Sequence, residues 1–306
     1  ERHEDAMALF SRVVDDERAP ALARDWARTY RAAHLRGMGR FDLAGQDEAD
    51  LGVVQSWFVA GPFDNERGTG FGQAHGPEAA PFDPAATFDG KKTTVGWRAL
   101  PLERLPRGEV DLDALMQPDD QALAYAITYL HADAPTPVAL RLGSDEAVAV
   151  WVNRAEVLRA DVRRPYRPDQ QAVGVTLKPG WNEVLLEVAD QTGDWRLRLR
   201  VSAPAGGPAR GVRVATLPEI AAKPTFEQGV EKVALPLDGV GALAARAAAA
   251  KDDWRARFHE GYLLLAMADP GNVLAVDDAR TLSRMPVQTV VATREDLAAA
   301  IDRYCR

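Results

Sequence analysis

Between residues 51 and 203 the apolar side chains recur at every second position, in short runs separated by glycine, proline, aspartate or asparagine. In the clearest run, 195–201, four large apolar residues alternate with Arg196, Arg198 and Arg200. A period of two places one set of side chains in a core and the other set on the opposite face of a sheet. Several such runs without helical segments between them predict an antiparallel β-sandwich or jelly roll. The other runs are 53–60, 123–129, 138–142, 147–152, 173–177 and 184–188.

The segments on either side of this region differ in the periodicity of their apolar residues. In 1–50 the apolar residues recur with a period of about 3.6 residues, which predicts two short antiparallel helices, the second beginning after Pro20 and ending near Gly37. Residues 204–225 open with a linker composition, and helical signals return in 226–260. The final segment, 261–306, alternates strand and helix signals and predicts a small βαβα unit. The predicted fold class is therefore multidomain α+β, a β-sandwich flanked by helical segments.

Composition excludes several classes of function. The chain carries 37 Lys and Arg against 45 Asp and Glu, and a diffuse net charge of −8 argues against nucleic-acid binding. Cys305 is the only cysteine, so no internal disulfide and no CxxC metal site is possible. The longest apolar run, Tyr262 to Ala268, is far shorter than the ~20 residues of a membrane-spanning helix, so no direct membrane insertion is expected.

No motif predicts an enzyme. The sequence lacks HExxH, GxSxG, an EF-hand loop, a GxGxxG that opens a helix and the Walker A pattern. Its five histidines are scattered without the spacing of zinc ligands, and Cys305 has no identifiable base beside it. We therefore expect a non-catalytic chain without an organic cofactor.

The sandwich region carries a recognisable series of motifs. It opens with Trp57 to Asn65, continues with "LGSDEAVAVWVNRAEVL" over 142–158 and closes with "LKPGWN" over 177–182. This series resembles the galactose-binding-like jelly rolls found beside glycoside hydrolases, in particular the sugar-binding-type domain of family 2 glycosidases. The resemblance implies a non-catalytic accessory domain. The family has Asn-Gly at the hairpin tip where this chain has Asn153-Arg154, so we expect a longer or distorted turn there.

A carbohydrate site needs aromatic faces beside hydroxyl-binding polar groups. The candidates for a ligand site are Trp181, which lies in a turn, Trp97, and the polar residues Asp145, Asn153 and Arg141. Two further tryptophans, Trp151 and Trp195, are in phase with apolar positions and are predicted to be buried. The outward arginines of 195–201 predict a solvated face or a packing surface for the flanking helices, with binding of an acidic polysaccharide as the alternative.

One weak metal site is suggested by Asp64 and Asn65. Their side-chain oxygens suit Ca²⁺, which jelly rolls often carry, but calcium takes six to eight oxygens and only two adjacent side chains are available. The alternative is an Asx-type turn at the end of the first strand, and it is the preferred interpretation.

Two further resemblances concern the flanks. Residues 1–50 resemble one unit of a tetratricopeptide-type array. The residues Leu263 to Pro270, Asn272 to Asp278 and Ala300 to Tyr304 resemble the end of the N-terminal domain of type II secretion and type IV pilus assembly ATPases. In that family the domain docks the motor to membrane or platform partners. The Arg-Leu-Gly repeats with which some members bind a cyclic dinucleotide are absent, so no nucleotide site is carried over.

The sequence thus favours a binding or scaffolding protein with a glycan or a partner protein as ligand. The alternatives are a secretion or pilus assembly component that docks a partner through its C-terminal domain, and the accessory region of a larger enzyme. A jelly roll favours a periplasmic or extracytoplasmic location, whereas the secretion-ATPase resemblance implies a cytoplasmic one, and both remain open.

Overall fold

The computed structural model describes residues 2–100 and 108–236. The chain divides into two compact units, Glu1–Leu235 and Pro236–Arg306, and the description below concerns the first. The predicted βαβα unit lies outside the described residues. Within them, no helix is long and apolar enough to span a membrane.

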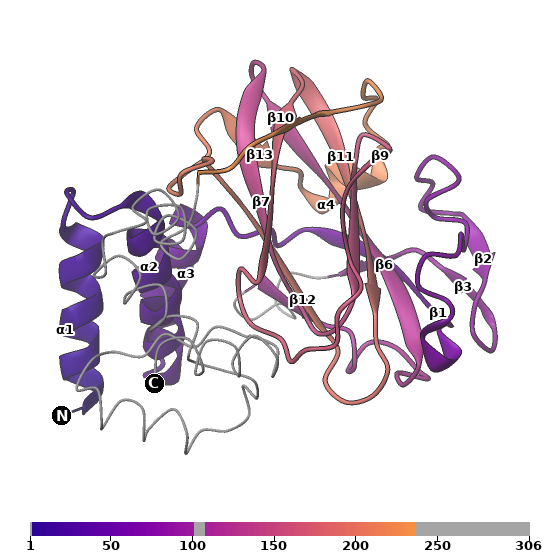
Figure 1. Cartoon of the computed structure of the whole chain (residues 1–306), viewed down its shortest axis with the longest axis horizontal. Coiled ribbons are helices and arrows are strands. Elements are labelled where there is room, and N and C mark those ends of the chain that lie inside the picture. The colour runs from indigo at the N-terminus through magenta and orange to yellow at the C-terminus, as the bar shows by residue number, and fades with distance from the viewer. Residues whose placement is uncertain (1, 101–107, 237–306) are drawn as a thin grey trace, which may run out of the picture. The chain divides into compact units, whose positions relative to one another are not determined.

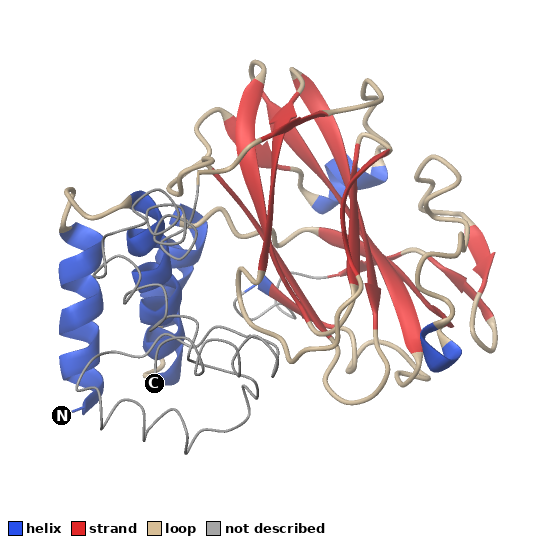
Figure 2. Ribbon diagram, viewed as in Figure 1, coloured by secondary structure: helices blue, strands red, loops and turns tan. Residues whose placement is uncertain are grey.

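Three helices precede the strands and lie together on one side of them (Figures 1 and 2). They are α1 (Arg2–Asp15), α2 (Ala21–Gly37) and α3 (Phe41–Asp50). As predicted, α2 begins directly after Pro20, whose fixed φ suits a helix start, and ends at Gly37. The third helix was not predicted, because its ten residues have too few apolar positions to show a period. The tetratricopeptide-type resemblance stays unconfirmed.

The strands form an antiparallel β-sandwich, which confirms the predicted fold class for this part of the chain. The larger sheet has the strand order β4-β1-β6-β11-β8-β9, with β13 also paired to β6, and the smaller has the order β14-β10-β7-β12-β5. A separate ribbon pairs β2 with β3. The bounds of the larger sheet are β1 (Trp57–Asp64), β4 (Arg98–Leu100), β6 (Ala122–Ala132), β8 (Val148–Val152), β9 (Ala155–Ala160), β11 (Gly180–Ala189) and β13 (Val212–Val214). Those of the smaller sheet are β5 (Glu109–Asp111), β7 (Thr136–Ser144), β10 (Gln171–Leu177), β12 (Arg196–Ser202) and β14 (Glu231–Val233), and the ribbon is β2 (Thr87–Asp89) with β3 (Thr94–Gly96).

The core between the two sheets is built from the period-two positions. Trp195, Leu197 and Leu199 of the clearest run are fully buried there, while the arginines between them point to the other face of the smaller sheet. Trp151 was predicted to lie in the core, but it is half-buried on the outer face of the larger sheet. The register of β8 against β9 shifts between Val150 and Trp151, where the valines of β8 take the inward positions.

A second apolar layer covers the outer face of the larger sheet. The segment 66–97, which includes the short helix Glu66–Gly68 and the β2–β3 ribbon, packs there with aromatic residues such as Phe82 and Trp97. The helix α4 (Leu217–Ala221) adds Ile220 to the same layer. Both faces of the larger sheet are therefore buried.

Two segments differ from the sequence prediction. The strand β13 and the helix α4 lie within 204–225, which was predicted to be a linker, because β13 pairs with β6 and Thr216 caps α4 together with Glu219. The strand β14 lies within 226–260, which was predicted to be helical, and pairs with β10. The sandwich thus continues about 30 residues beyond the predicted boundary at 203.

The β8–β9 hairpin also differs from the prediction. Val152 pairs with Ala155, so the turn contains only two residues, and both have positive φ, 49° for Asn153 and 68° for Arg154. A long side chain is unfavourable in that backbone region. Arg154 is held there because its guanidinium pairs with Glu183 at 2.7 Å and donates to the carbonyl oxygen of Pro77 at 3.2 Å. Of the two alternatives that we expected, a longer or a distorted turn, the longer turn was wrong.

Candidate functional site

The residues predicted for a ligand site lie in several separate places. Trp181 and Asn153 are near the same end of β11. The Trp181 ring packs edge-on against His131, with centroids 5.1 Å apart, and the Arg213 guanidinium lies 4.7 Å from its centroid. Asn153 is buried. Its amide donates to Asn182 at 2.8 Å and its carbonyl oxygen accepts the Glu183 N–H at 2.9 Å, so these contacts fix the hairpin.

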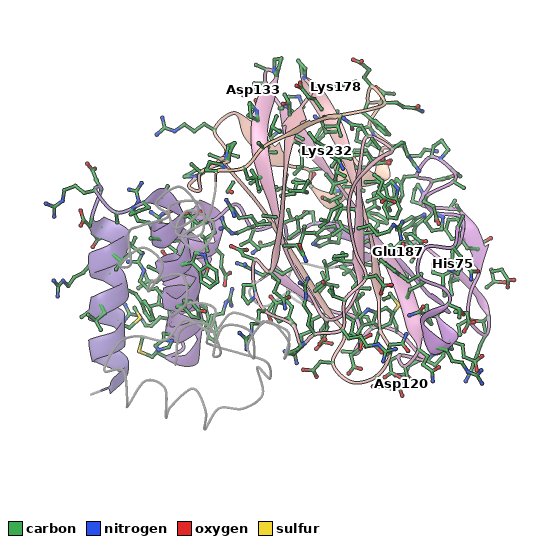
Figure 3. All side chains as sticks on the ribbon, in the orientation of Figure 1. His75, Asp120, Asp133, Lys178, Glu187 and Lys232 are labelled. Carbon is green, nitrogen blue, oxygen red and sulfur yellow. The ribbon has the colours of Figure 1, made fainter. Side chains whose placement is uncertain are left out.

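Asp145 lies at the opposite end of the sandwich. Its N–H donates to the carbonyl of Arg196, and the turn that contains it pairs with the far end of β11 at Ala189. Because β11 has ten residues, Trp181 and Asp145 are separated by roughly 30 Å of strand. Figure 3 shows the two ends, with Lys178 labelled at one and Asp120 at the other. Trp181 and Asp145 therefore cannot contact the same sugar ring.

Arg141 and Trp97 are on opposite outer faces. Arg141 is buried on the smaller sheet, where it donates to Ser202 Oγ at 3.0 Å and to the Pro204 carbonyl at 3.1 Å. Burial, followed by the nearby charge of Arg200, lowers the pKa of its guanidinium. Trp97 is 8% exposed and packs edge-on against Phe82 over the larger sheet. Both side chains are engaged in packing.

Asp64 and Asn65 close the first strand. Asn65 is 1% exposed, its carbonyl oxygen accepts the N–H groups of Gly70 and Phe71 at 3.1 and 3.0 Å, and its amide donates to the Asp190 carbonyl. Asp64 pairs with Lys91 at 3.2 Å. These contacts are those of an Asx residue that organises a turn. In residues 2–100 and 108–236 no three His, Cys, Asp or Glu side chains are arranged to hold a metal. Calcium at Asp64 and Asn65 stays a prediction.

A cavity of about 270 Å³ lies between α2 and the smaller sheet. Of its lining residues, only Arg196 and Arg198 were considered from the sequence, as an alternative surface for an acidic polysaccharide. One wall comes from α2 and α3 and the other from β5, β12 and the segment before β10. It combines two tyrosines, two arginines and two glutamates. The polar and aromatic lining residues are Tyr30, Tyr166, Arg196, Arg198, Glu48 and Glu109.

A buried ionic network joins the two walls of this cavity. Arg200 of β12 is completely buried and donates to Asp25 of α2 at 3.0 Å and to Asp169 at 2.7 Å. Asp25 also accepts the N–H of Gly207 at 2.9 Å. The chain that leaves α3 adds main-chain bonds, in which Val54 donates to Leu199. The arginine face of 195–201 is thus a packing surface for the helices, as one of the two preferred interpretations predicted.

The charges around the cavity differ in how far they are already paired. Glu48 is held by two bonds from Arg36, at 2.7 and 2.5 Å. Arg198 and Glu109 are cross-strand neighbours. Burial, followed by the adjacent Glu109 carboxylate, raises the pKa of Tyr166, so this phenol stays protonated beside Glu109. The Arg196 side chain is 38% exposed, and among the described residues its ion-pair partner is the exposed Asp194, 3.5 Å away.

These features suit a small polar ligand. Tyr30 is 46% exposed and offers an aromatic face, while Arg196 and the Tyr166–Glu109 pair offer donors and acceptors within one concave surface. Sequence reasoning missed the site because its residues are spread from 29 to 198. Two features of the sequence could have pointed to the site: the alternating arginines of 195–201, and the spacing of Trp26 and Tyr30 on one face of a helix. Both aromatic side chains are exposed in the structure.

Two buried glutamates on the opposite side of the sandwich are covered. Glu183 accepts a bond from the Tyr129 hydroxyl at 2.9 Å, and burial raises its pKa although Arg154 counteracts this. Glu187 is 1% exposed, and burial raises its pKa to about 7, with Arg159 at 3.6 Å opposing the shift. Figure 3 places Glu187 and His75 on this side. Both glutamates are 1% exposed, and the segment 66–97 reaches them through the N–H of Gly72 at Glu187 and through Pro77, whose carbonyl binds the Arg154 partner of Glu183.

Comparison with known proteins gives one family match. The model of the MshEN domain matches residues 254–306, in agreement with the resemblance of the C-terminal segment. No curated protein matches the chain.

Several solved structures resemble parts of the chain. The PA14 domain of the MpAFP antifreeze protein is 15% identical, with a TM-score of 0.26, and the match covers 31% of this chain and 52% of that one. A family 35 carbohydrate-binding module from an environmental isolate is 19% identical, with a TM-score of 0.24 and 30% and 71% covered. An anti-sigma factor domain-containing protein from Clostridium clariflavum is 13% identical, with a TM-score of 0.32 and 60% and 51% covered. This chain therefore spans about half of the first of these chains. All three TM-scores are low, so nothing about the activity of this chain follows from them.

Proposed function

We propose that this chain is a non-catalytic binding protein that holds a small polar ligand of the carbohydrate class in the cavity between α2 and the smaller sheet. The observation that carries the proposal is the lining of that cavity. An exposed tyrosine ring suits the C–H face of a sugar, and the arginines and glutamates suit its hydroxyl groups. The volume of about 270 Å³ fits one sugar residue better than a chain of them.

The paired charges of the cavity favour a neutral sugar. Two arginines and two glutamates give the lining no net charge, and Glu48 is already neutralised by Arg36. A strongly acidic sugar would gain only Arg196, whose neighbour Asp194 opposes an anion. Selectivity would then come from hydroxyl geometry rather than from charge.

The test is a glycan-array screen of the full chain followed by titration of each hit. Tyr30→Ala and Arg196→Ala should each weaken binding at least tenfold, because each removes a group that faces the cavity without being part of the core. The matched control is Trp181→Ala, an aromatic residue at the far end of the sandwich, which should leave the affinity unchanged. Loss of binding in the control alone, or no hit with a folded chain, would overturn the proposal.

A second function is favoured by the match of residues 254–306 to the MshEN domain. In this alternative the chain is a component of a secretion or pilus machine and docks a partner through its C-terminal unit. Affinity capture from cells that carry such a machine should recover platform proteins with the full chain and not after deletion of 236–306. Tyr30→Ala should leave this capture intact, which separates the two functions.

The third possibility, an accessory region of a larger enzyme, makes the same prediction for the cavity. It differs in that the sugar bound in the cavity should also be a substrate or product of that enzyme. Sequencing the gene beyond both ends of this segment would identify the enzyme.

A further inference from the structure

Two aromatic side chains stand exposed on α2, one helical turn apart. Trp26 is 40% exposed and Tyr30 is 46% exposed. Within 2–100 and 108–236 the exposed large apolar side chains all lie between residues 9 and 43, in the helical part of the chain. Positions i and i+4 lie on one face of a helix. Trp26 and Tyr30 therefore form a single aromatic surface, which we call the aromatic strip of α2.

The two rings of the aromatic strip meet at a shallow angle. Their centroids are 6.0 Å apart and their planes differ by 31°. Phe10 of α1 lies 6.0 Å from the Tyr30 ring and is inclined to it by only 17°, and the same phenylalanine packs edge-on against His34. In Figure 1 α1 is the helix farthest from the strands. The orientation of the strip is thus fixed from the α1 side, by contacts that leave both rings exposed.

The aromatic strip begins at the cavity and continues outside it. Tyr30 is one of the residues that line the cavity, and Trp26 is not. At the turn of Trp26 the space between α2 and the smaller sheet is closed, because Asp25 is buried there and accepts a bond from Arg200 at 3.0 Å. Trp26 lies on the solvent side of this ion pair. A ligand that extends along α2 beyond the cavity would therefore meet the Trp26 ring.

The spacing and tilt of the rings suit a glycan chain. Aromatic rings bind the C–H faces of sugars without needing a charge on either partner. The distance of 6.0 Å between the ring centres is comparable to the length that one pyranose residue adds to a chain. A tilt of 31° suits successive sugars whose faces are nearly parallel, as in an extended β-1,4-linked chain. A coiled α-1,4-linked chain turns its faces away from one another.

We infer that the ligand is a neutral, extended β-1,4-linked glycan, whose end residue enters the cavity at Tyr30 and whose next residue stacks on Trp26. This inference rests on the proposed function and adds the class of sugar to it. The cavity of about 270 Å³ holds the end residue alone, so the rest of the chain lies outside, over the aromatic strip. Trp26 is a binding residue for the second sugar only.

The experiment measures affinity against chain length, by isothermal titration calorimetry of the full chain. The probes are glucose, galactose, mannose and xylose, the β-1,4-linked oligomers of each up to the hexasaccharide, and the α-1,4-linked glucose series for comparison. From monosaccharide to disaccharide the dissociation constant should fall about two- to tenfold, the effect of one added aromatic contact. Longer chains should gain little more, because α2 has no aromatic residue before Trp26.

Variants separate the two sugar positions. Trp26→Ala should lose the gain from monosaccharide to disaccharide, and Trp26→Phe should restore part of it. Tyr30→Ala should weaken the binding of every member of the series, since Tyr30 lines the cavity. The matched control is Phe41→Ala, an aromatic residue 60% exposed at the start of α3, which should bind the whole series as the wild type does. If Trp26→Ala does not fold, Trp26→Leu replaces it with the same expected loss.

Three outcomes would overturn the inference and leave the proposed function standing. One is a monosaccharide that binds as tightly as its oligomers. Another is a gain with chain length that survives in Trp26→Ala, in which case the exposed rings serve a different contact, such as a partner protein. The third is an equal gain in the α-1,4-linked series. If no monosaccharide and no oligomer binds to the folded chain, the proposed function fails, and this inference fails with it.

Discussion

The two outer faces of the sandwich are both covered, but their buried charges are compensated very differently. On the smaller sheet Arg200 is enclosed by Asp25 and Asp169, with distances of 2.7 to 3.0 Å, and the helices lie over this network. On the larger sheet Glu187 is as deeply buried, yet its basic neighbour Arg159 is 3.6 Å away and one of its oxygens has no donor. The difference between the two faces is therefore the distance from the buried charge to its nearest opposite charge, 2.6 Å for Arg200 and 3.6 Å for Glu187.

The largest expected effect comes from Arg200→Ala. It leaves Asp25 and Asp169 buried without their cation, which should lower the free energy of unfolding by about 3–5 kcal/mol. Denaturant unfolding of the variant measures this loss. The control is Arg196→Ala on the same strand, where the side chain is 38% exposed and the loss should stay below about 1 kcal/mol. Equal losses in the two variants would contradict the compensation described here.

The second effect is the pH dependence of Glu187. Its pKa is about 7 in the folded chain and near 4.5 in the unfolded chain, so the folded chain binds more protons between these values. The free energy of unfolding should therefore fall as the pH rises through this window, by up to about 1.4 kcal/mol per pH unit from this group. Glu187→Gln should flatten the curve by that amount. A curve parallel to the wild type between pH 5 and 7 would show that Glu187 is compensated after all.

A third and smaller effect is expected for Tyr129→Phe. The change removes the hydroxyl that donates to Glu183 at 2.9 Å and leaves a buried acceptor with only Arg154. Such a loss costs about 1–3 kcal/mol, measurable by thermal unfolding. Tyr30→Phe, at an exposed position, is the matched control and should change the Tm very little. No difference between the two would mean that water replaces the missing hydroxyl.

The smallest effect concerns Phe71, which lies over the Arg159 guanidinium at 5.0 Å. Phe71→Leu keeps an apolar cover but removes the ring, so the loss should be about 0.5–1 kcal/mol. A double-mutant cycle with Arg159→Met isolates this pairwise energy. A coupling energy of zero would indicate that Phe71 acts only as a cover for the glutamates.

The period-two runs predicted seven strands, because the alternation of side chains along a strand depends only on the residues of that strand. The inward position of Trp195 followed for the same reason. The outer layer over the larger sheet was not predictable in this way. Strand β6 is apolar or aromatic on both faces and shows no alternation, and β11 carries Glu183 and Glu187 on the face that the layer covers, where a sequence pattern predicts exposure. The two-residue turn at Asn153 and Arg154 was missed because contacts with Glu183 and Pro77, remote in sequence, offset the cost of its backbone.

The candidate site was still less predictable. Arg200 and Asp25 are 175 residues apart, and no local pattern couples two such positions. The cavity has the residue types that the sequence analysis required of a sugar site, an aromatic face with nearby arginine and acid, but at Tyr30, Arg196 and Glu109 rather than at Trp181 and Asp145. The location of the proposed site depends on contacts between segments remote in sequence, which no local pattern reports.

The last strand of the described unit, β14, has a mechanical consequence. It is three residues long and, among the described strands, lies at the edge of the smaller sheet and pairs only with β10. The chain then continues into the C-terminal unit. A tension applied through that unit would therefore load β14 first and peel its three residue pairs away one after another. Separating β14 from the sheet breaks three residue pairs, whereas separating β10 from β7 breaks seven.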